Sequence, residues 1–290
     1  MKKLIEIKNV TKSYGTKKVL AGLDLTVRQG EIIALLGENG AGKTTLINII
    51  NGLSRATSGE VVLFLPQSKI GVMLQSNLTL NRVKVSEVLK LARSYYDKPL
   101  AYSELLRLSA LTEKENALMT ELSGGQKRRL SFALALAGDP DLIFLDEPTT
   151  GMDAERRKEF WLEIARLQAL GKTFFVTSHY LEELENIASR LVLLASHVVK
   201  FDGTLADLRA QNAATEISFN YDGKLPTTLQ SVVSTDRTGN FYFLTTNDTN
   251  RLTASLVPLF DKGLTNLCIQ QNSLDHLFGT LVSADKGRKL

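Results

Sequence analysis

Apolar residues in the first two hundred positions recur at spacings that predict strands alternating with helices. Continuous apolar runs predict strands buried on both faces at residues 32–36, 142–145, 174–177 and 191–194. Half-buried or shorter strands are expected at 4–10, 19–27 and 61–65. Helices are expected at 44–51, from Ala154 onward, and at 181–188, a segment rich in glutamate. This alternation predicts a parallel sheet covered by helices on both faces.

A helical insertion interrupts the alternation at residues 83–118. Apolar side chains recur there at helical spacing, first at Val88, Leu91, Ala92 and Tyr95 and then at Leu105, Leu108 and Leu111. We expect a helical subdomain over about residues 83–137.

The composition changes after about Arg209, where threonine, asparagine and serine become more frequent. Strand-like segments follow at 216–221, 240–245 and 267–270, and a helix is expected at 250–262. The chain is therefore predicted to form a first domain of residues 1–209 and a small α+β domain of residues 210–290.

Composition limits the classes of function. The chain has 290 residues, a net charge of +4 and one cysteine, Cys268, so an intrachain disulfide is excluded. Basic residues are spread along the sequence, which argues against a nucleic-acid partner. No run approaches the roughly 18 apolar residues of a membrane span. If the protein works at a membrane, another chain is expected to supply the span.

A glycine-rich motif between a buried strand and a helix predicts a phosphate-binding loop. Residues 37–44 fit the pattern G-x-x-x-x-G-K-[ST]. Backbone N–H groups of such a loop curl around phosphates, and the helix N-terminus adds partial positive charge. We expect the following residues to bind the phosphates of a nucleotide: Gly37, Asn39, Gly40, Ala41, Gly42, Lys43, Thr44 and Thr45.

Two carboxylates end the apolar strand at residues 142–145. Asp146 and Glu147 would lie at the carboxyl edge of a parallel sheet, where open α/β folds bind ligands. Asp146 suits the coordination shell of Mg²⁺, together with Thr44, and Glu147 suits the polarisation of an attacking water.

The segment 122–126, Leu-Ser-Gly-Gly-Gln, distinguishes among families with such a loop. Ser123 can cap the helix that follows, and Gly124 and Gly125 allow backbone to approach an anion. Together with residues 138–141 and 146–153, this segment resembles the ABC ATPase family almost residue for residue. The resemblance covers roughly residues 4–205.

This resemblance implies an α/β fold of the P-loop NTPase, ABC type. It would have a mostly parallel sheet, an antiparallel β subdomain, an inserted helical subdomain and a small C-terminal α+β domain.

The resemblance also implies roles for single residues. Tyr14 matches the aromatic residue that stacks on adenine, and Gln75 matches a glutamine at the Mg²⁺ site that responds to the membrane partner. His179 matches a histidine that contacts the γ-phosphate, and Asp153 lies in a loop at the dimer seam. The catalytic set would be Glu147, Gln75 and His179.

The family also implies a second copy of the chain as partner. Ser123, Gly124, Gly125 and Gln126 of one copy would face ATP bound to the phosphate loop of the other.

Residues 136–140, 179–185 and 273–278 look most like ATP-binding subunits of ABC-2 type exporters. These work at the cytoplasmic face of a bacterial cell membrane with an integral membrane permease subunit. An importer ATPase and a non-transport regulatory ATPase are alternatives. Only fifteen residues separate Gly59 from Gln75, fewer than the family usually has.

Overall fold

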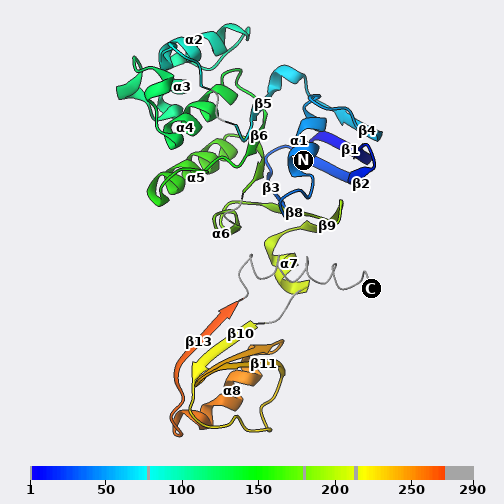
Figure 1. Ribbon diagram of the computed structural model, residues 1–290, viewed down its shortest axis with the longest axis vertical. Coiled ribbons are helices and arrows are strands. Elements are labelled where there is room, and N and C mark those ends of the chain that lie inside the picture. Colours follow the sequence, from blue (N-terminus) through cyan, green and yellow to red (C-terminus); the bar gives the residue numbers. More distant parts are fainter. Residues whose placement is uncertain (1, 77–78, 179–180, 212–214, 272–290) are drawn as a thin grey trace. The chain divides into compact units, whose positions relative to one another are not determined.

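The chain divides into two compact units, Met1–Thr204 and Leu205–Leu290 (Figure 1). The computed structural model describes residues 2–76, 79–178, 181–211 and 215–271. The change in composition near Arg209 lies inside helix α7 (Leu205–Gln211), which the contacts assign to the second unit. The boundary between units is therefore five residues earlier than the composition indicates.

A six-stranded sheet forms the centre of the first unit. Its strands, in spatial order, are β5 (Ile70–Met73), β6 (Leu142–Asp146), β7 (Thr173–Thr177), β3 (Ile32–Leu36), β8 (Arg190–Ala195) and β9 (Val198–Gly203). All neighbours run parallel except β8 and β9. Every residue of β3, β6 and β7 is buried, as continuous apolar runs predict. The predicted parallel sheet is confirmed.

This topology brings five strand ends to one edge of the sheet. Because β5, β6, β7, β3 and β8 run parallel as neighbours, their carboxyl ends meet there. The residues at these ends are Met73, Asp146, Thr177, Leu36 and Ala195. Segments that are far apart in the sequence thereby become neighbours at the edge where the sequence motifs lie.

A three-stranded antiparallel sheet shares a hydrophobic core with the parallel sheet. Its order is β2 (Lys17–Arg28), β1 (Lys3–Tyr14) and β4 (Ser58–Leu63). Helix α1 (Lys43–Ile50) follows β3 and buries Leu46, Ile47 and Ile50 in one core with apolar residues of both sheets. The core thus fixes the start of α1 against β2 and β3.

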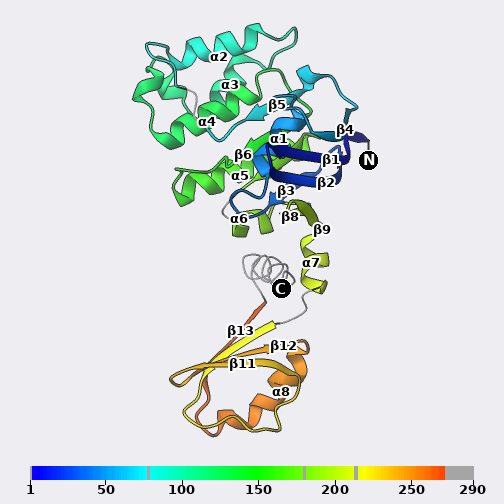
Figure 2. The same ribbon diagram turned by 45° about the vertical axis from the view of Figure 1, so that its right-hand side comes forward.

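The helical subdomain contains α2 (Val85–Ser94), α3 (Tyr102–Ser109) and α4 (Gly124–Ala135). These helices group together on the side of the first unit away from β1, β2 and β4 (Figures 1 and 2). The buried face of α2 carries Val85, Val88 and Leu89, whereas Leu91 and Tyr95 are exposed. The spacing predicts the helix correctly, but it does not identify all of its buried face.

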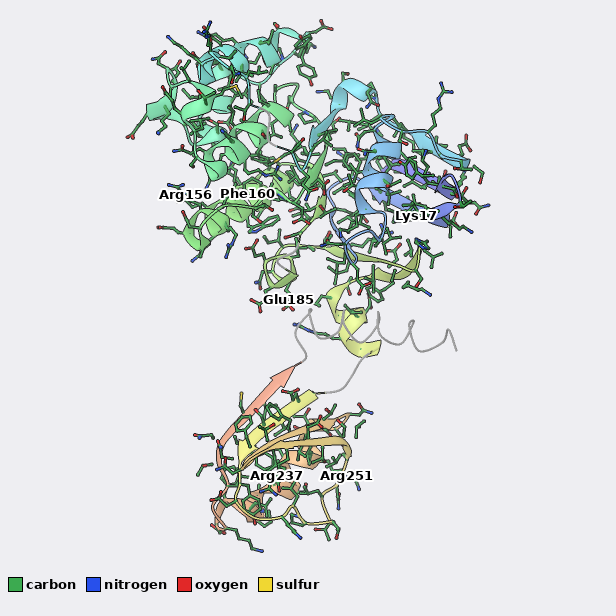
Figure 3. The ribbon with its side chains drawn as sticks, viewed as in Figure 1. Lys17, Arg156, Phe160, Glu185, Arg237 and Arg251 are labelled. Carbon is green, nitrogen blue, oxygen red and sulfur yellow. The ribbon has the colours of Figure 1, made fainter. Side chains whose placement is uncertain are left out.

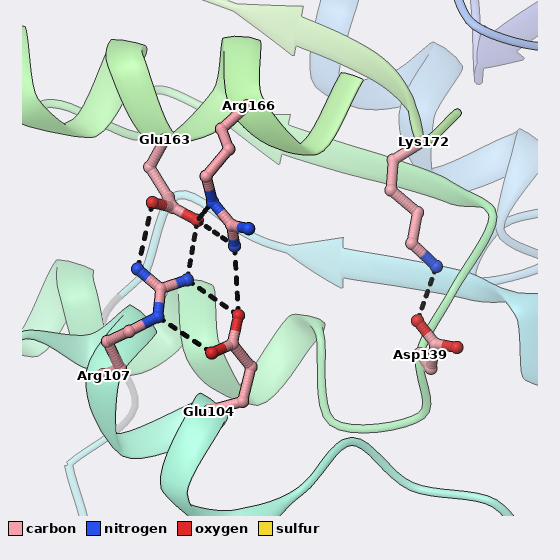
Figure 4. A network of polar contacts seen from close by, with 6 residues as sticks. All are labelled: Glu104, Arg107, Asp139, Glu163, Arg166 and Lys172. Atoms are coloured by element: carbon pink, nitrogen blue, oxygen red, sulfur yellow. Dashed lines mark hydrogen bonds and ion pairs between the residues drawn. The ribbon is translucent and has the colours of Figure 1, made fainter. Parts of the chain in front are cut away.

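Helix α5 (Ala154–Ala169) joins the insertion to the sheet. Phe160 of α5, labelled in Figure 3, packs edge-to-face on Phe132 of α4 with ring centroids 4.8 Å apart. Figure 4 shows Arg107 of α3 between Glu104 and Glu163, with Arg166 bonded to both carboxylates. An aromatic contact and an ionic network therefore hold the insertion on α5.

The remaining short elements of the first unit connect the larger ones. They are α6 (Leu181–Glu185) and the 3₁₀ turns Gln67–Lys69, Thr112–Lys114 and Met119–Glu121. Helix α6 is shorter than the predicted 181–188. Among the described residues, no helix is both long and apolar enough to cross a bilayer.

The second unit is an α+β fold in which an antiparallel sheet carries a helix on one face. The sheet order is β11 (Val232–Thr238), β12 (Phe241–Thr246), β10 (Thr215–Asn220) and β13 (Thr265–Gln271). Leu252 and Leu256 of α8 (Thr249–Phe260) pack on Ile217, Phe219 and Leu244 of the sheet. Strand β11 was not predicted, because it is an edge strand whose side chains are almost all exposed and mostly polar.

Candidate active site

A cavity of about 460 Å³ opens at the carboxyl edge of the parallel sheet. Its lining comprises Lys17, Val19, Asn39, Gly40, Gly42, Lys43, Thr44, Thr45, Gln75, Asp146 and Glu147. All of these except Lys17 and Val19 are residues that the sequence motifs single out. The fold therefore brings the glycine-rich loop, the strand-end carboxylates and Gln75 around one space.

The loop between β3 and α1 forms a concave backbone that requires glycine. Gly42 has φ +110°, in the left-handed region, and a Cβ there would lie 2.8 Å from Leu20 Cδ2 and 3.0 Å from Val19 O. A side chain at this position would therefore collide with β2. Because α1 begins at Lys43, its unpaired N–H groups lie beside this loop, an arrangement that favours anions.

Lys43 reaches across the base of the loop. Its ammonium donates to the Gly37 carbonyl at 2.6 Å and to the Glu38 carbonyl at 3.3 Å. Burial lowers the pKa of Lys43, while the nearby carboxylates of Glu147 and Asp146 partly oppose that shift. A cation held by carbonyl oxygens in a half-buried cavity is poised to pair with an anion of higher charge.

Asp146 is 2% exposed, and two threonine hydroxyls donate to its carboxylate. Thr177 Oγ1 donates to Oδ1 at 2.5 Å, and Thr44 Oγ1 donates to Oδ2 at 3.2 Å. The oxygens of Thr44 and Asp146 thus lie side by side against the cavity. Hard oxygen ligands contributed by a hydroxyl and a carboxylate, beside a place for phosphates, fit Mg²⁺.

Glu147 lines the cavity next to Asp146 and has an unusual backbone. Its φ of 53° lies in the left-handed region, which costs a non-glycine residue about 1–2 kcal/mol. Its amide donates to the hydroxyl of Thr177 at 3.1 Å and to the carbonyl at 3.2 Å. These bonds to Thr177 help to hold Glu147 in this conformation, in which it lines the cavity.

Some predicted residues lie away from the cavity. Tyr14 ends β1, is 55% exposed, and has the Lys12 ammonium 4.6 Å from its ring centroid, but it does not line the cavity. Gly37 and Ala41 belong to the loop without lining it, and Gly37 contributes only its carbonyl to Lys43. His179 lies outside the described residues.

The segment 123–126 forms the start of α4 and does not line the cavity either. Gln126 N donates to Ser123 Oγ at 3.3 Å, and Ser123 N donates to Gln126 Oε1 at 2.9 Å. The capping role predicted for Ser123 is confirmed. Asp153 similarly caps α5, because its carboxylate accepts from Arg156 N at 2.9 Å. Both segments stand at helix N-termini.

Sequence reasoning missed four residues of this region. Lys17, labelled in Figure 3, and Val19 enter the lining from β2 and belong to no motif. Thr177 lies at the end of a predicted strand, but only the pairing of β7 with β6 brings it to the carboxylate of Asp146 and the backbone amide of Glu147. Arg128 sits in a short basic cluster that resembles a solvated helix face, although it is 2% exposed.

Comparison with known proteins identifies relatives of this chain. A family model described as ABC transporter matches residues 20–150. Nod factor export ATP-binding protein I of Rhizobium meliloti strain 1021 is 40% identical over 210 residues, or 67% of this chain and 63% of that protein. The protein of the same name from Rhizobium etli is 35% identical over 243 residues, 79% of this chain and 77% of that protein. The chain thus spans slightly under two thirds of the first relative and about three quarters of the second.

Solved structures share the fold of the first unit. An ATP-binding subunit of an ABC transporter matches with a TM-score of 0.66 and 27% identity, over 72% of this chain and 93% of that one. A dimeric bacterial ABC transporter cassette matches with a TM-score of 0.63 and 26% identity, over 70% of this chain and 99% of that one. The P-loop NTPase fold of ABC type, expected from the sequence, is confirmed.

Proposed function

Because the chain belongs to the ABC transporter family of ATP-binding proteins, whose members are ATPases, we propose that it hydrolyses ATP to drive export through a separate membrane subunit. The hydrolysis part depends on the cavity that joins the phosphate loop to Asp146 and Glu147. The export part is supported by the relatives, which are named Nod factor export proteins.

Each group in the cavity has a role in this proposal. Backbone N–H groups at the start of α1 and the Lys43 ammonium bind the phosphates of ATP. Thr44 and Asp146, with Gln75 nearby, would hold Mg²⁺, which when bound neutralises charge on the phosphates. Glu147 accepts a proton from a water aimed at the terminal phosphorus and thereby strengthens the nucleophile. Thr177 keeps both carboxylates in place through the bonds to Asp146 and to the Glu147 amide.

We propose that a second copy of the chain completes the site. Ser123 and Gly124 are exposed at the N-terminus of α4 but do not line the cavity of their own chain. A helix N-terminus is suited to bind phosphate oxygens, so this segment is available to a nucleotide held by another chain. A solved relative of the fold is a dimer in a post-hydrolysis state bound to ADP and phosphate. ATP would then stabilise the dimer, and hydrolysis would release it.

The membrane partner would be an integral permease subunit, which would place this chain at the cytoplasmic face of a bacterial membrane. Both relatives described above come from bacteria and are named for export.

Substituting Glu147 with glutamine tests the hydrolytic part. Glutamine keeps the size of the side chain but cannot take up a proton, so we expect kcat to fall at least about 100-fold with ATP affinity retained. Glu155→Gln, on an exposed carboxylate in the first turn of α5, is the matched control and should hydrolyse at the wild-type rate. A Glu147→Gln variant with wild-type kcat would overturn the assignment of Glu147.

The same variant tests the dimer. In size-exclusion chromatography with ATP and Mg²⁺, Glu147→Gln should elute as a dimer, and with ADP as a monomer. A monomer under saturating ATP would overturn dimerisation of the isolated chain.

Purification from detergent-solubilised membranes of cells that express the tagged chain tests the export proposal. We expect an integral membrane protein to copurify and to raise the ATPase rate when both are reconstituted in vesicles. Copurification with a complex that requires a solute-binding protein would point to import instead. Neither result would alter the assignment of the hydrolytic site.

A further inference from the structure

Arg128 of α4 places its charged group in the interior, behind the nucleotide cavity. The residue is 2% exposed, and its guanidinium donates to four backbone carbonyls. Nη1 donates to the carbonyls of Leu74 and Gln75, each at 2.9 Å. Nη2 donates to the carbonyl of Asp146 at 2.6 Å and also to that of Glu147. All four N–H groups of the two terminal nitrogens are therefore used.

These carbonyls belong to two segments that are remote in sequence. Leu74 and Gln75 follow β5, and Asp146 and Glu147 end and follow β6. Both segments lead into the cavity, which Gln75, Asp146 and Glu147 line. Arg128 itself lies one turn beyond the capped start of α4 at Ser123. One side chain thus connects α4, which Ser123 caps, to two segments that line the cavity.

The bonding of Arg128 requires a guanidinium. Burial lowers its pKa, while the negative charges of Asp146 and Glu147 oppose that change. Arginine nevertheless stays protonated in proteins, and its planar fork can serve two pairs of acceptors at once. Its Nε has no hydrogen-bond partner among the described residues. A lysine ammonium is a single point donor and cannot reach both segments with equivalent geometry.

The backbone of Glu147 gives this contact its importance. Glu147 occupies the left-handed region at φ 53°, which is unfavourable unless the surroundings hold it. Thr177 holds the amide of Glu147, and Arg128 holds its carbonyl. If the bond from Arg128 is lost, the Glu147 carbonyl keeps the long bond from Thr150 N at 3.4 Å, so this turn is held more weakly than before.

We propose that Arg128 is a positioning residue, which holds Gln75 and Glu147 in place and makes their position depend on that of α4. This inference rests on the proposed ATPase function and extends it, because Arg128 does not line the cavity and acts only through the two segments that it holds. Movement of α4, which begins at the segment proposed to meet the second copy, would thereby reach the water-activating carboxylate.

The test compares Arg128→Lys with Arg190→Lys in the full-length chain. Arg190 is a matched control, because it is also a largely buried arginine that joins strands, through Thr26 O at 2.8 Å and Asp202 at 2.5 and 2.7 Å. It does not line the cavity. Two measurements are made on each variant: kcat and KM for ATP hydrolysis, and hydrogen–deuterium exchange without nucleotide in peptides that cover residues 144–150.

For Arg128→Lys we expect kcat to fall about 10- to 100-fold, because a displacement of about 1 Å at a catalytic group costs on that order. KM should change less than about threefold, since the phosphate loop is untouched. Exchange at 144–150 should rise about tenfold relative to the wild type. Arg190→Lys should change neither kcat nor exchange at 144–150.

Two results would overturn the inference. One is unchanged exchange at 144–150 in Arg128→Lys. The other is a kcat that stays within about twofold of the wild type, or that falls only in parallel with ATP affinity. If the wild type hydrolyses no ATP even with its membrane partner, the proposed function fails, and the catalytic part of the inference fails with it. The exchange measurement still decides whether Arg128 holds the segment.

Discussion

Thr177 offers a stringent test of how the two strand-end carboxylates are supported. It is fully buried at the end of β7, and its hydroxyl donates to Asp146 Oδ1 at 2.5 Å while accepting from the Glu147 amide at 3.1 Å. Thr177→Val keeps the shape of the side chain and removes both interactions. The Glu147 amide retains its second acceptor, the Thr177 carbonyl at 3.2 Å. The carboxylate of Asp146 is left with the longer bond from Thr44 at 3.2 Å.

The structure sets the magnitude of this loss. A hydrogen bond to a charged group contributes about 1.5–3 kcal/mol, and the Glu147 amide adds little because it is not orphaned. We therefore expect the free energy of unfolding of the first unit to fall by about 2 kcal/mol. For a unit of this size that corresponds to a melting temperature about 4–8 °C lower.

Urea titration of the full-length chain at neutral pH measures this change. The chain has one tryptophan, Trp161, which lies in the first unit, so its fluorescence follows the unfolding of that unit alone. Thr173→Val on the same strand is the control, because the Thr173 hydroxyl accepts from an uncharged donor, Gly30 N, at 2.9 Å. We expect the control to lose about 1 kcal/mol. If Thr177→Val is no less stable than Thr173→Val, the hydroxyl does not support Asp146 as described.

Four further predictions concern Lys43, the network around Arg107 and the C-terminal region. Lys43→Met should weaken ATP binding at least about tenfold by calorimetry with the circular dichroism spectrum unchanged, and a wild-type affinity would contradict the role of the loop. Burial lowers the pKa of Lys43, so between that lowered pKa and 10.5 the folded chain binds fewer protons than the unfolded chain. The contribution of Lys43 to the free energy of unfolding therefore rises with pH in this range. Urea titrations of Lys43→Met should show a free energy of unfolding that depends less on pH there. The hydrogen bond from Arg107 lowers the pKa of Glu104; at Glu163 burial raises the pKa, but the bonds from Arg107 and Arg166 outweigh it and the pKa is lowered there too. The stabilisation by this network is therefore present above the ordinary value of 4.5 and is lost as the pH falls through the lowered values. Arg107→Gln should cost about 0.5–1 kcal/mol at pH 7 and nothing at strongly acid pH, and an equal cost at both would refute the ionic origin. A chain truncated after Ala210 should bind ATP like the full-length chain, and a folded but nucleotide-blind product would show that the C-terminal region contributes to the site.

Much of the first unit was predictable, because its central strands are buried on both faces. The runs at 32–36, 142–145 and 174–177 are almost entirely apolar, as a strand covered on both faces requires. The bounds of each run agree with those of a strand of the parallel sheet to within one residue. The edge strand β11 had no such signal. Polar side chains occur on both faces of β11, so its sequence shows neither an alternation of apolar and polar residues nor a long apolar run.

The same contrast separates predicted from unpredicted site residues. Asn39, Lys43, Thr44, Asp146 and Glu147 belong to local motifs, and the structure places all five around the cavity. Tyr14 was proposed from the family resemblance alone, and the structure leaves it outside the lining. Lys17 and Val19 reach the cavity because β2 packs against the loop, an arrangement that depends on the fold of the whole unit.

Thr177 and Arg128 show why local motifs describe only part of such a site. Residues adjacent in sequence are enough to form a loop around phosphate. A short sequence motif can therefore specify the groups that face the ligand. The position of Glu147 also depends on a threonine thirty residues later and an arginine nineteen residues earlier. These contacts exist only because β7 lies beside β6 and α4 packs behind both β5 and β6. Since Glu147 has a backbone conformation that isolated residues avoid, its place in the cavity depends on these distant neighbours as much as on its own motif.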